Sequence, residues 1–345
     1  MTSPVVDERA VTSLLESRRT EINTAIDEDL PTAEPARLYE ASRYLLEAGG
    51  KRLRPALLLL VAEAIMDVDV GSEAYRSFPS FHEQRIDIMK AAVSIEVIQS
   101  FTLIHDDIMD DDELRRGVPA VHEAFDIETA ILAGDTLYSK AFEIMLDSGA
   151  PSEHSIDALR LLAETCTQIC EGQALDIAFE DGNDVTIPEY RSMIERKTAV
   201  LFKAAAAVPA LLVGADDATI TALQRYGLAV GEAFQIYDDV LDLVVPSDTL
   251  GKQRGSDLVE GKRTLITLHA AENGVDIDSI RPERGDVAAI EAAVETLESA
   301  GSIEYANRKA SELVESGIDE LDVLPRNDAH DMLCDLARYL VEREY

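Results

Sequence analysis

The apolar residues of this chain recur mainly at intervals of three and four, the spacing that gathers them on one side of an α-helix. No convincing two-residue alternation indicates strands. Between the helical stretches, the segments 67–85, 181–187 and 246–256 read as loops, and the residues of 67–85 give no hint of its purpose. The pattern predicts helices over residues 5–27, 35–48, 55–66, 86–109, 121–146, 154–180, 188–212, 217–245, 257–273, 286–299, 302–317 and 328–343. We therefore expect an all-α fold and one domain over residues 1–345.

The composition adds an extreme charge to this helical pattern. The chain has 67 acidic and 31 basic residues, and its formal net charge is -36. The acids are spread along the chain while the apolar fraction stays that of a globular protein, which argues against disorder. Such a surface indicates a halophilic protein, because high salt screens the repulsion between its carboxylates. It also argues against nucleic acid as a partner.

The ends and the cysteines point to an intracellular protein. The first ten residues, MTSPVVDERA, are polar and acidic, unlike a signal peptide. The longest apolar run, 55–62, is too short to cross a membrane. The three cysteines (Cys166, Cys170 and Cys334) form neither a zinc pattern nor a disulfide framework. We expect a cytoplasmic protein without stable membrane insertion.

Two acidic motifs of the form DDxxD interrupt the apolar helices. Aspartates four residues apart lie on one helix face, where like charges repel unless a cation is present. One copy would be weak evidence in so acidic a chain, but both copies lie in apolar helical sequence. Oxygen ligands of this kind suit magnesium. The candidate metal ligands are Asp106, Asp107 and Asp110 in the first motif, and Asp238, Asp239 and Asp242 in the second.

Only eight of the basic residues are lysines, and four of these (Lys51, Lys197, Lys252 and Lys262) lie in or beside candidate site segments. Lys51 and Arg54 surround the start of a helix that opens near Pro55, where free backbone N–H groups favour an anion. Arg115 and Arg116 directly follow the first motif. Carboxylates, cations and apolar helices together indicate a phosphate-bearing substrate with a hydrocarbon tail. We expect the two acidic helices to face one another across one cavity, the usual way in which a helical bundle builds a site.

Several motifs in a fixed order resemble those of trans-isoprenyl (polyprenyl) diphosphate synthases. The resemblance covers roughly residues 40 to 270 and is greatest to archaeal short-chain enzymes, such as a geranylgeranyl diphosphate synthase of a halophile. The motifs are GGKRLRP, LIHDDIMDDDELRRG, GVPAVH, EGQALDI, MIERKTAVLF, GEAFQIYDDVLDL and LGKQRGSDLVEGKRTL.

The resemblance implies a terpenoid-synthase helical bundle around a central cavity, a homodimer, and two or three magnesium ions bound by the two DDxxD motifs. Such enzymes join isopentenyl diphosphate to an allylic diphosphate. The residues implied for isopentenyl diphosphate are Lys51, Arg54, Gln99 and Arg116. The residues implied for the allylic diphosphate are Arg115, Lys197, Thr198, Gln235, Lys252 and Lys262.

Two further positions, Gln99 and His105, lie in the helix that carries the first acidic motif. Gln99 stands where the family often has histidine, and glutamine can donate a hydrogen bond but carries no charge. His105, beside two aspartates, fits a structural hydrogen-bond partner better than a catalytic base.

The resemblance implies geranylgeranyl diphosphate as the product, because in this family an aromatic residue at the position of Phe101, beside a small one, goes with twenty-carbon products. Phe101 lies five residues before Asp106, about 7.5 Å along the helix axis, and its ring with the small neighbour Thr102 would floor the cavity for the tail. A farnesyl or twenty-five-carbon product is the alternative. A terpene cyclase is a less favoured alternative, because Lys51, Arg54 and Arg116 supply a second diphosphate site that a cyclase does not need. A non-catalytic partner subunit of a heteromeric synthase is also less favoured. Such a subunit should lack one acidic motif or the lysine and arginine set, and this chain keeps both.

Overall fold

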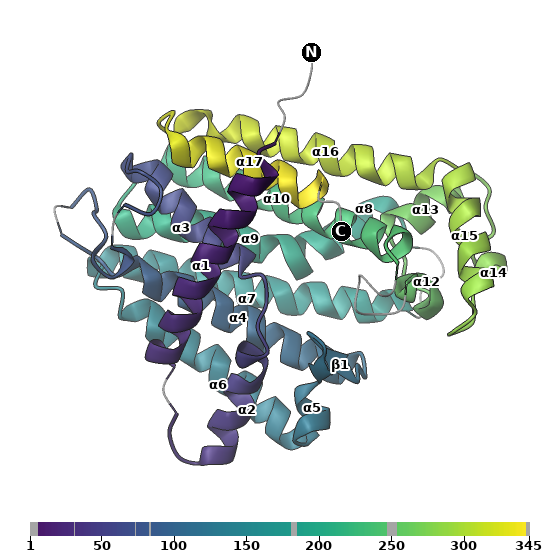
Figure 1. Cartoon of the computed structure of the whole chain (residues 1–345), viewed down its shortest axis with the longest axis horizontal. Helices are drawn as coiled ribbons and strands as arrows, with labels where there is room; N and C mark the ends of the chain where they lie inside the picture. The colour runs from purple at the N-terminus through teal and green to yellow at the C-terminus, as the bar shows by residue number, and fades with distance from the viewer. Residues whose placement is uncertain are drawn as a thin grey trace. The chain divides into compact units, whose positions relative to one another are not determined.

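A computed structural model describes residues 6–30, 32–72, 74–82, 84–180, 185–246 and 254–342 (Figure 1), and these residues are mostly helical, as predicted. They form two compact units. One comprises residues up to 166, 201–227 and 320–336, and the other 167–200, 228–319 and the residues from 337 onward. Each unit is described by itself below, and the single domain expected from the sequence remains a prediction.

The first unit is built around helix α4 (Ile88–Met109), which packs mainly against α6 (Ile127–Leu146) and α3 (Leu53–Met66). α4 is long and apolar enough to span a membrane, but 67% of that stretch is buried inside the fold, as expected of a core helix. Besides a hairpin and the first parts of two long helices, both described below, this unit contains α1 (Glu8–Asp29), α2 (Ala36–Glu47), η1 (Tyr75–Ser77), α5 (Val121–Ala124), α9 (Val200–Val213, from Leu201), η3 (Leu321–Val323) and the first part of α17 (Asp328–Glu342).

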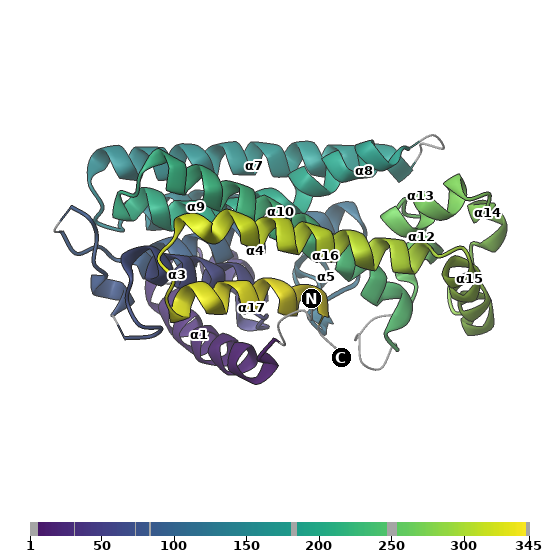
Figure 2. The same ribbon diagram turned by 90° about the horizontal axis from the view of Figure 1, so that it is seen from above.

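The second unit contains the later part of two long helices, α7 (Ser152–Glu180) and α10 (Asp217–Val244), with the helices that follow each of them. Helix α16 (Ser302–Glu320) runs as one long helix in Figure 2. The remaining elements are α8 (Ile187–Ile194), a π-helical turn η2 (Glu195–Ala199), α12 (Ser256–Glu260), α13 (Leu265–Glu272), α14 (Ile277–Ile280), α15 (Val287–Ser299) and α16 (Ser302–Glu320).

Local chemistry breaks two of the predicted helices. The range 121–146 is divided because Asp126 accepts a hydrogen bond from the backbone N–H of Thr129 at 2.6 Å and starts α6. The range 257–273 is divided because Gly261, with φ of 79°, ends α12, and Thr264 then caps α13.

A small hairpin follows the first acidic motif, where no strand was predicted. β1 (Leu114–Arg115) and β2 (Val118–Pro119) pair antiparallel across a two-residue turn. The turn residues Arg116 and Gly117 have φ of 55° and 77°. Positive φ at both positions is the requirement of a type I′ turn, which matches the twist of the paired strands.

The segment 67–85 is tied to the core through Glu63, which is fully buried on α3. Its carboxylate accepts hydrogen bonds from the backbone N–H of Gly71 and from the Tyr75 hydroxyl, both at 2.7 Å. It also pairs with the buried guanidinium of Arg18 on α1, at 2.7 Å. This buried pair joins α1, α3 and the start of the segment.

Candidate active site

The first acidic motif forms the last turn of α4. The backbone N–H of Asp110 donates to the carbonyl of Asp106 at 2.8 Å, so the two residues are helical neighbours four apart, as predicted. Both side chains are half-buried. Their carboxylates can therefore act together on one ligand from the same helix face.

Asp107 is turned away from this pair and toward the hairpin. Its Oδ1 accepts a hydrogen bond from Nε of Arg115 at 2.6 Å, while Asp112 pairs with the same guanidinium at 2.9 Å. Burial raises the pKa of the Asp107 carboxyl, and the hydrogen bond and charge of Arg115 oppose that rise. The middle aspartate of the motif thus orients the first arginine of the RRG sequence.

The residues expected to hold isopentenyl diphosphate all belong to the first unit. Lys51 is exposed just before α3, and the Arg54 guanidinium lies 4.3 Å from the centre of the Phe202 ring. Gln99 is half-buried on α4. Arg116 donates to the carbonyl of Leu45 at 3.0 Å, so part of its guanidinium is held by backbone.

Phe101, the expected floor residue, belongs to an aromatic cluster between α4 and α6. Its ring packs edge-on against two others. The ring centres lie 5.3 Å apart for Tyr138 and 5.0 Å apart for His105. Nε2 of His105 lies 3.2 Å from the carbonyl oxygen of Ile131, and Gly134 leaves the space that the imidazole fills. The imidazole is thus engaged with α6, as expected for a structural role. Thr102 donates its hydroxyl to the carbonyl of Gln99 at 2.9 Å.

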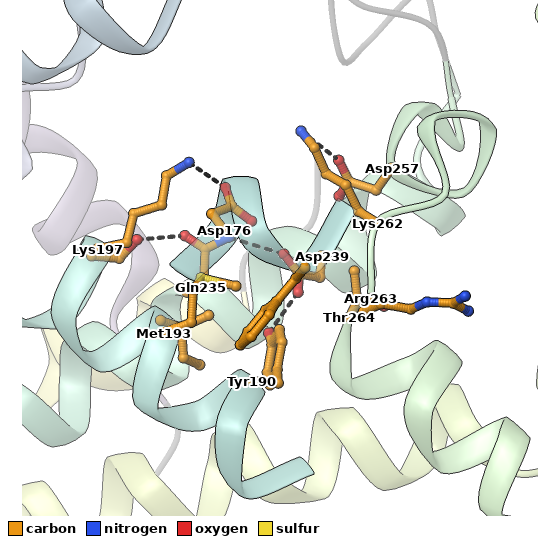
Figure 3. Close-up of a pocket in the computed structure, with 13 residues that line it drawn as sticks. Asp176, Tyr190, Met193, Lys197, Gln235, Asp239, Asp257, Lys262, Arg263 and Thr264 are labelled. Carbon is orange, nitrogen blue, oxygen red and sulfur yellow. Dashed lines mark hydrogen bonds and ion pairs between the residues drawn. The ribbon is translucent and has the colours of Figure 1, made fainter. Parts of the chain in front are cut away.

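The second acidic motif borders a pocket within the second unit, which encloses about 110 Å³ (Figure 3). Asp239 is the motif aspartate that lines this pocket. The pocket is lined by Asp176, Phe179, Tyr190, Met193, Ile194, Lys197, Thr198, Gln235, Asp239, Asp257, Lys262, Arg263 and Thr264.

A chain of hydrogen bonds links four residues that line this pocket. The Thr198 hydroxyl donates to Oε1 of Gln235 at 2.8 Å, and Nε2 of Gln235 donates to Oδ1 of Asp239 at 2.9 Å. From the other side, the Tyr190 hydroxyl donates to Oδ2 of Asp239 at 2.6 Å (Figure 3). Burial raises the pKa of Asp239, the charge of Asp257 raises it further, and the two hydrogen bonds oppose the rise. Burial therefore disfavours the charged form of this carboxyl, and a bound cation would stabilise that form.

A π-helical turn presents Lys197 and Thr198 to the pocket. Such turns often occur at functional sites because the extra residue redirects the side chains around it. Nζ of Lys197 reaches Asp176 on α7 at 2.6 Å. Gly172 on α7 permits this approach, since a Cβ there would lie 2.3 Å from the backbone nitrogen of Lys197.

The other two aspartates of the second motif have different surroundings. Asp242 is buried and accepts hydrogen bonds from the Ser256 hydroxyl at 2.7 Å and the Asp257 backbone N–H at 3.1 Å. It therefore fixes the turn that carries Asp257. Asp238 is half-buried.

Of the two lysines expected in the following loop, Lys262 lines the pocket and lies 3.1 Å from Glu260 and 3.8 Å from Asp257. Lys252 lies outside the described residues.

The residues present fit magnesium that completes its coordination with other ligands. Within the ranges that the structure describes, no group of three or more His, Cys, Asp or Glu is gathered around one point. Magnesium usually takes one or two carboxylates and fills the remaining positions with water and phosphate oxygens. The half-buried Asp106 and Asp110 and the buried Asp239 supply oxygen donors of that kind.

Among the pocket residues that were not singled out from the sequence, three contact residues that were. Asp176 and Asp257 lie inside the quoted motifs EGQALDI and LGKQRGSDLVEGKRTL, and their carboxylates near lysines are the signal that could have identified them. Tyr190 is fully buried and gives no comparable signal, because its role depends on a partner 49 residues away.

Comparisons with known proteins show the family of this chain. The sequence profile of the polyprenyl synthetase family matches residues 35–297. The chain is 62% identical to a geranylfarnesyl diphosphate synthase from Natronomonas pharaonis, over 97% of this chain and 98% of the relative. It is 47% identical to a geranylgeranyl diphosphate synthase from Methanosarcina mazei, over 96% and 97% of the two chains. The crystal structure of a geranylgeranyl pyrophosphate synthetase from Pyrococcus horikoshii superposes with a TM-score of 0.87 at 38% identity, covering 97% of this chain and 99% of that one. The chain therefore belongs to the polyprenyl synthetase family.

Proposed function

We propose that this chain is a magnesium-dependent trans-prenyltransferase that joins isopentenyl diphosphate to an allylic diphosphate. The observation that carries the proposal is the second-unit pocket, where Lys197 and Lys262 stand beside the hydrogen-bonded Asp239. Cations for phosphate oxygens and a carboxylate for magnesium are the two requirements of diphosphate binding. Membership of the family supports the same reaction class.

The proposed roles follow the groups described above. Asp106, Asp107, Asp110, Asp238, Asp239 and Asp242 serve magnesium, with Asp107 and Asp242 acting mainly through Arg115 and the 254–257 turn. Lys51, Arg54, Gln99 and Arg116 hold isopentenyl diphosphate. Arg115, Lys197, Thr198, Gln235, Lys252 and Lys262 hold the allylic diphosphate.

Bound magnesium supplies electrostatic stabilisation of the leaving diphosphate. The lysine and arginine donors do the same from the protein as the allylic C–O bond breaks and its electron pair leaves with diphosphate. The double bond of isopentenyl diphosphate then attacks the allylic cation, a new C–C bond forms, and the adjacent carbon loses a proton. In this scheme the released diphosphate accepts that proton. Nε2 of His105 is engaged with the carbonyl of Ile131 on α6.

The proposed product has twenty carbons, because the Phe101 ring with Tyr138 would stop a growing tail. A twenty-five-carbon product is the second candidate, and the 62% identical geranylfarnesyl diphosphate synthase favours it. We further propose a cytoplasmic homodimer that works in high salt, as the net charge of -36 suggests.

The metal assignment is tested with Asp106→Ala and Asp238→Ala. Each variant should lose at least ~10²-fold in turnover, with the helical circular-dichroism signal unchanged. Asp217→Ala is the matched control, because Asp217 is an exposed aspartate in the first turn of α10, the helix that carries Asp238. Full activity in either motif variant would overturn the assignment.

A further inference from the structure

Glu96 is a buried carboxylate on α4 that the roles assigned so far do not use. Its side chain is 4% exposed. One oxygen, Oε1, accepts a short hydrogen bond from Nη1 of Arg52 and lies 3.5 Å from Nη2 of Arg116. A single carboxylate oxygen thus joins Arg52, the first arginine of the GGKRLRP segment, to Arg116 in the turn of the hairpin.

Arg52 is held on all sides, although its backbone is unusual. Its φ is 51°, a left-handed conformation that residues other than glycine rarely adopt. Besides Glu96, its guanidinium donates from Nε to the Asn23 side chain at 2.9 Å and from Nη2 to the carbonyl of Leu46 at 2.6 Å. Such a conformation persists where its surroundings over-determine it. Lys51 precedes Arg52 directly and Arg54 follows two residues later, so fixing Arg52 fixes the backbone from which both side chains extend.

Arg116 is held from two directions as well. It occupies the first position of the type I′ turn and donates from Nη1 to the carbonyls of Leu45 and Gly49. Gly50 makes room for it, since a Cβ at that position would lie 2.9 Å from Cζ of Arg116. The backbone carbonyls satisfy one side of the guanidinium, and the Glu96 carboxylate lies at the other.

The charge of Glu96 is as important as its hydrogen bonds. Arg52 is 1% and Arg116 17% exposed at the side chain, so two cations approach each other with little water between them. Without the carboxylate they would repel, and a buried charge left without its partner is strongly unfavourable. Gln99 lies one turn further along the same face of α4, three residues after Glu96.

We propose that Glu96 is the positioning residue of the isopentenyl diphosphate site. It acts through Arg52 and Arg116 and so sets the places of Lys51 and Arg54. This inference rests on the proposed function, which assigns Lys51, Arg54, Gln99 and Arg116 to that substrate.

The test is Glu96→Gln, which keeps the size of the side chain and removes its charge. Steady-state kinetics should show KM for isopentenyl diphosphate raised on the order of tenfold. KM for the allylic substrate should stay within about twofold of the wild-type value. A purely structural role would lower activity without this split between the two substrates.

Glu63→Gln is the matched control, because Glu63 is also a buried glutamate paired with an arginine in the same unit. It should lower the unfolding temperature and leave both KM values unchanged. If Glu96→Gln fails to fold by circular dichroism, Arg52→Lys takes its place. That variant keeps the positive charge but loses the planar fork, and the same split is expected.

The outcomes separate the two proposals. A wild-type protein without turnover would overturn the proposed function and the role of Glu96 with it. An active wild type would leave the function standing. In that case, unchanged KM values in the Glu96 or Arg52 variant, or equal rises for both substrates, would overturn the role of Glu96 alone.

Discussion

The hydroxyl of Tyr190 donates a 2.6 Å hydrogen bond to the buried carboxylate of Asp239, 49 residues further along the chain. Gln235 donates to the other oxygen of the same carboxylate at 2.9 Å. The orientation of this aspartate is therefore set by two neighbours before any ligand binds. Partners of this kind commonly tune the affinity of a metal site.

Tyr190→Phe removes one of these hydrogen bonds and keeps the ring. The magnesium concentration for half-maximal activity should rise on the order of tenfold, because the carboxylate is no longer held on one side. The magnesium-dependent rise in unfolding temperature should move to higher concentrations in parallel. Tyr226→Phe is the control, since Tyr226 is an equally buried tyrosine that donates to the carbonyl of Leu333 at 3.0 Å. An unchanged magnesium requirement in Tyr190→Phe would contradict the account.

Phe101→Ala tests the floor of the hydrocarbon cavity. Removing the ring that meets Tyr138 should let the tail grow, so chromatography of the products should show chains longer than those of the wild type. Phe125→Ala removes a ring that packs edge-on against Tyr44 and should leave the product length unchanged. An unaltered product from Phe101→Ala would show that this ring only packs the core.

The start of α6 should give the stability of the protein a distinct pH dependence. Hydrogen bonds from Thr129, and then from Arg37, hold the pKa of Asp126 at about 2, below its ordinary 3.8. Because the folded-state pKa is the lower one, the stabilisation is present above about pH 4 and is lost as the pH falls toward 2. Asp126→Ala should therefore lower the unfolding temperature near neutral pH, and the difference from the wild type should vanish toward pH 2.

Glu128→Gln is the control for that cap. It neutralises another exposed carboxylate in the first turn of α6 and leaves the Asp126 hydrogen bond in place. It should change the unfolding temperature much less than Asp126→Ala does. Equal effects of the two variants would assign the stabilisation to charge near the helix end rather than to the cap.

An apolar stripe on α6 offers a surface for the expected homodimer. Large exposed apolar side chains at such a density mark interaction surfaces. Leu132→Asp should lower the molar mass measured by light scattering from that of a dimer to that of a monomer. Val287→Asp, a change of an equally exposed residue on α15, should leave the mass unaltered. A monomeric wild type would contradict the expectation. The exposed residues on α6 are Ile127, Ile131, Leu132, Tyr138 and Leu146.

Apolar periodicity was enough to predict most of the helices. The range 217–245, for example, matches α10 (Asp217–Val244) within one residue, because burial of one face decides where such a helix lies. The breaks at Asp126 and Gly261 were missed, since a single cap or a single positive φ ends a helix without altering the apolar pattern around it. The hairpin was missed for a different reason, because its two-residue strands are too short to show alternation.

The sequence motifs identified part of the candidate site, while the roles of those residues stay predictions. Lys197, Gln235 and Asp239 do line one pocket. Glu96 and Tyr190 were not predicted, because a buried polar residue gains its meaning from partners far away in the sequence. The separate roles of adjacent aspartates also depend on tertiary contacts, as with Asp107, which pairs with Arg115.

Prenyl transfer between two diphosphates can be measured with the purified protein in a single assay. The purified protein is incubated in molar potassium chloride and magnesium with labelled isopentenyl diphosphate and farnesyl diphosphate, and the products are separated by chain length. We expect a labelled prenyl diphosphate of twenty carbons, or of twenty-five if the second candidate holds, formed only when both substrates and magnesium are present. No labelled product, turnover only after a second subunit is added, or a hydrocarbon made from farnesyl diphosphate alone would contradict that expectation.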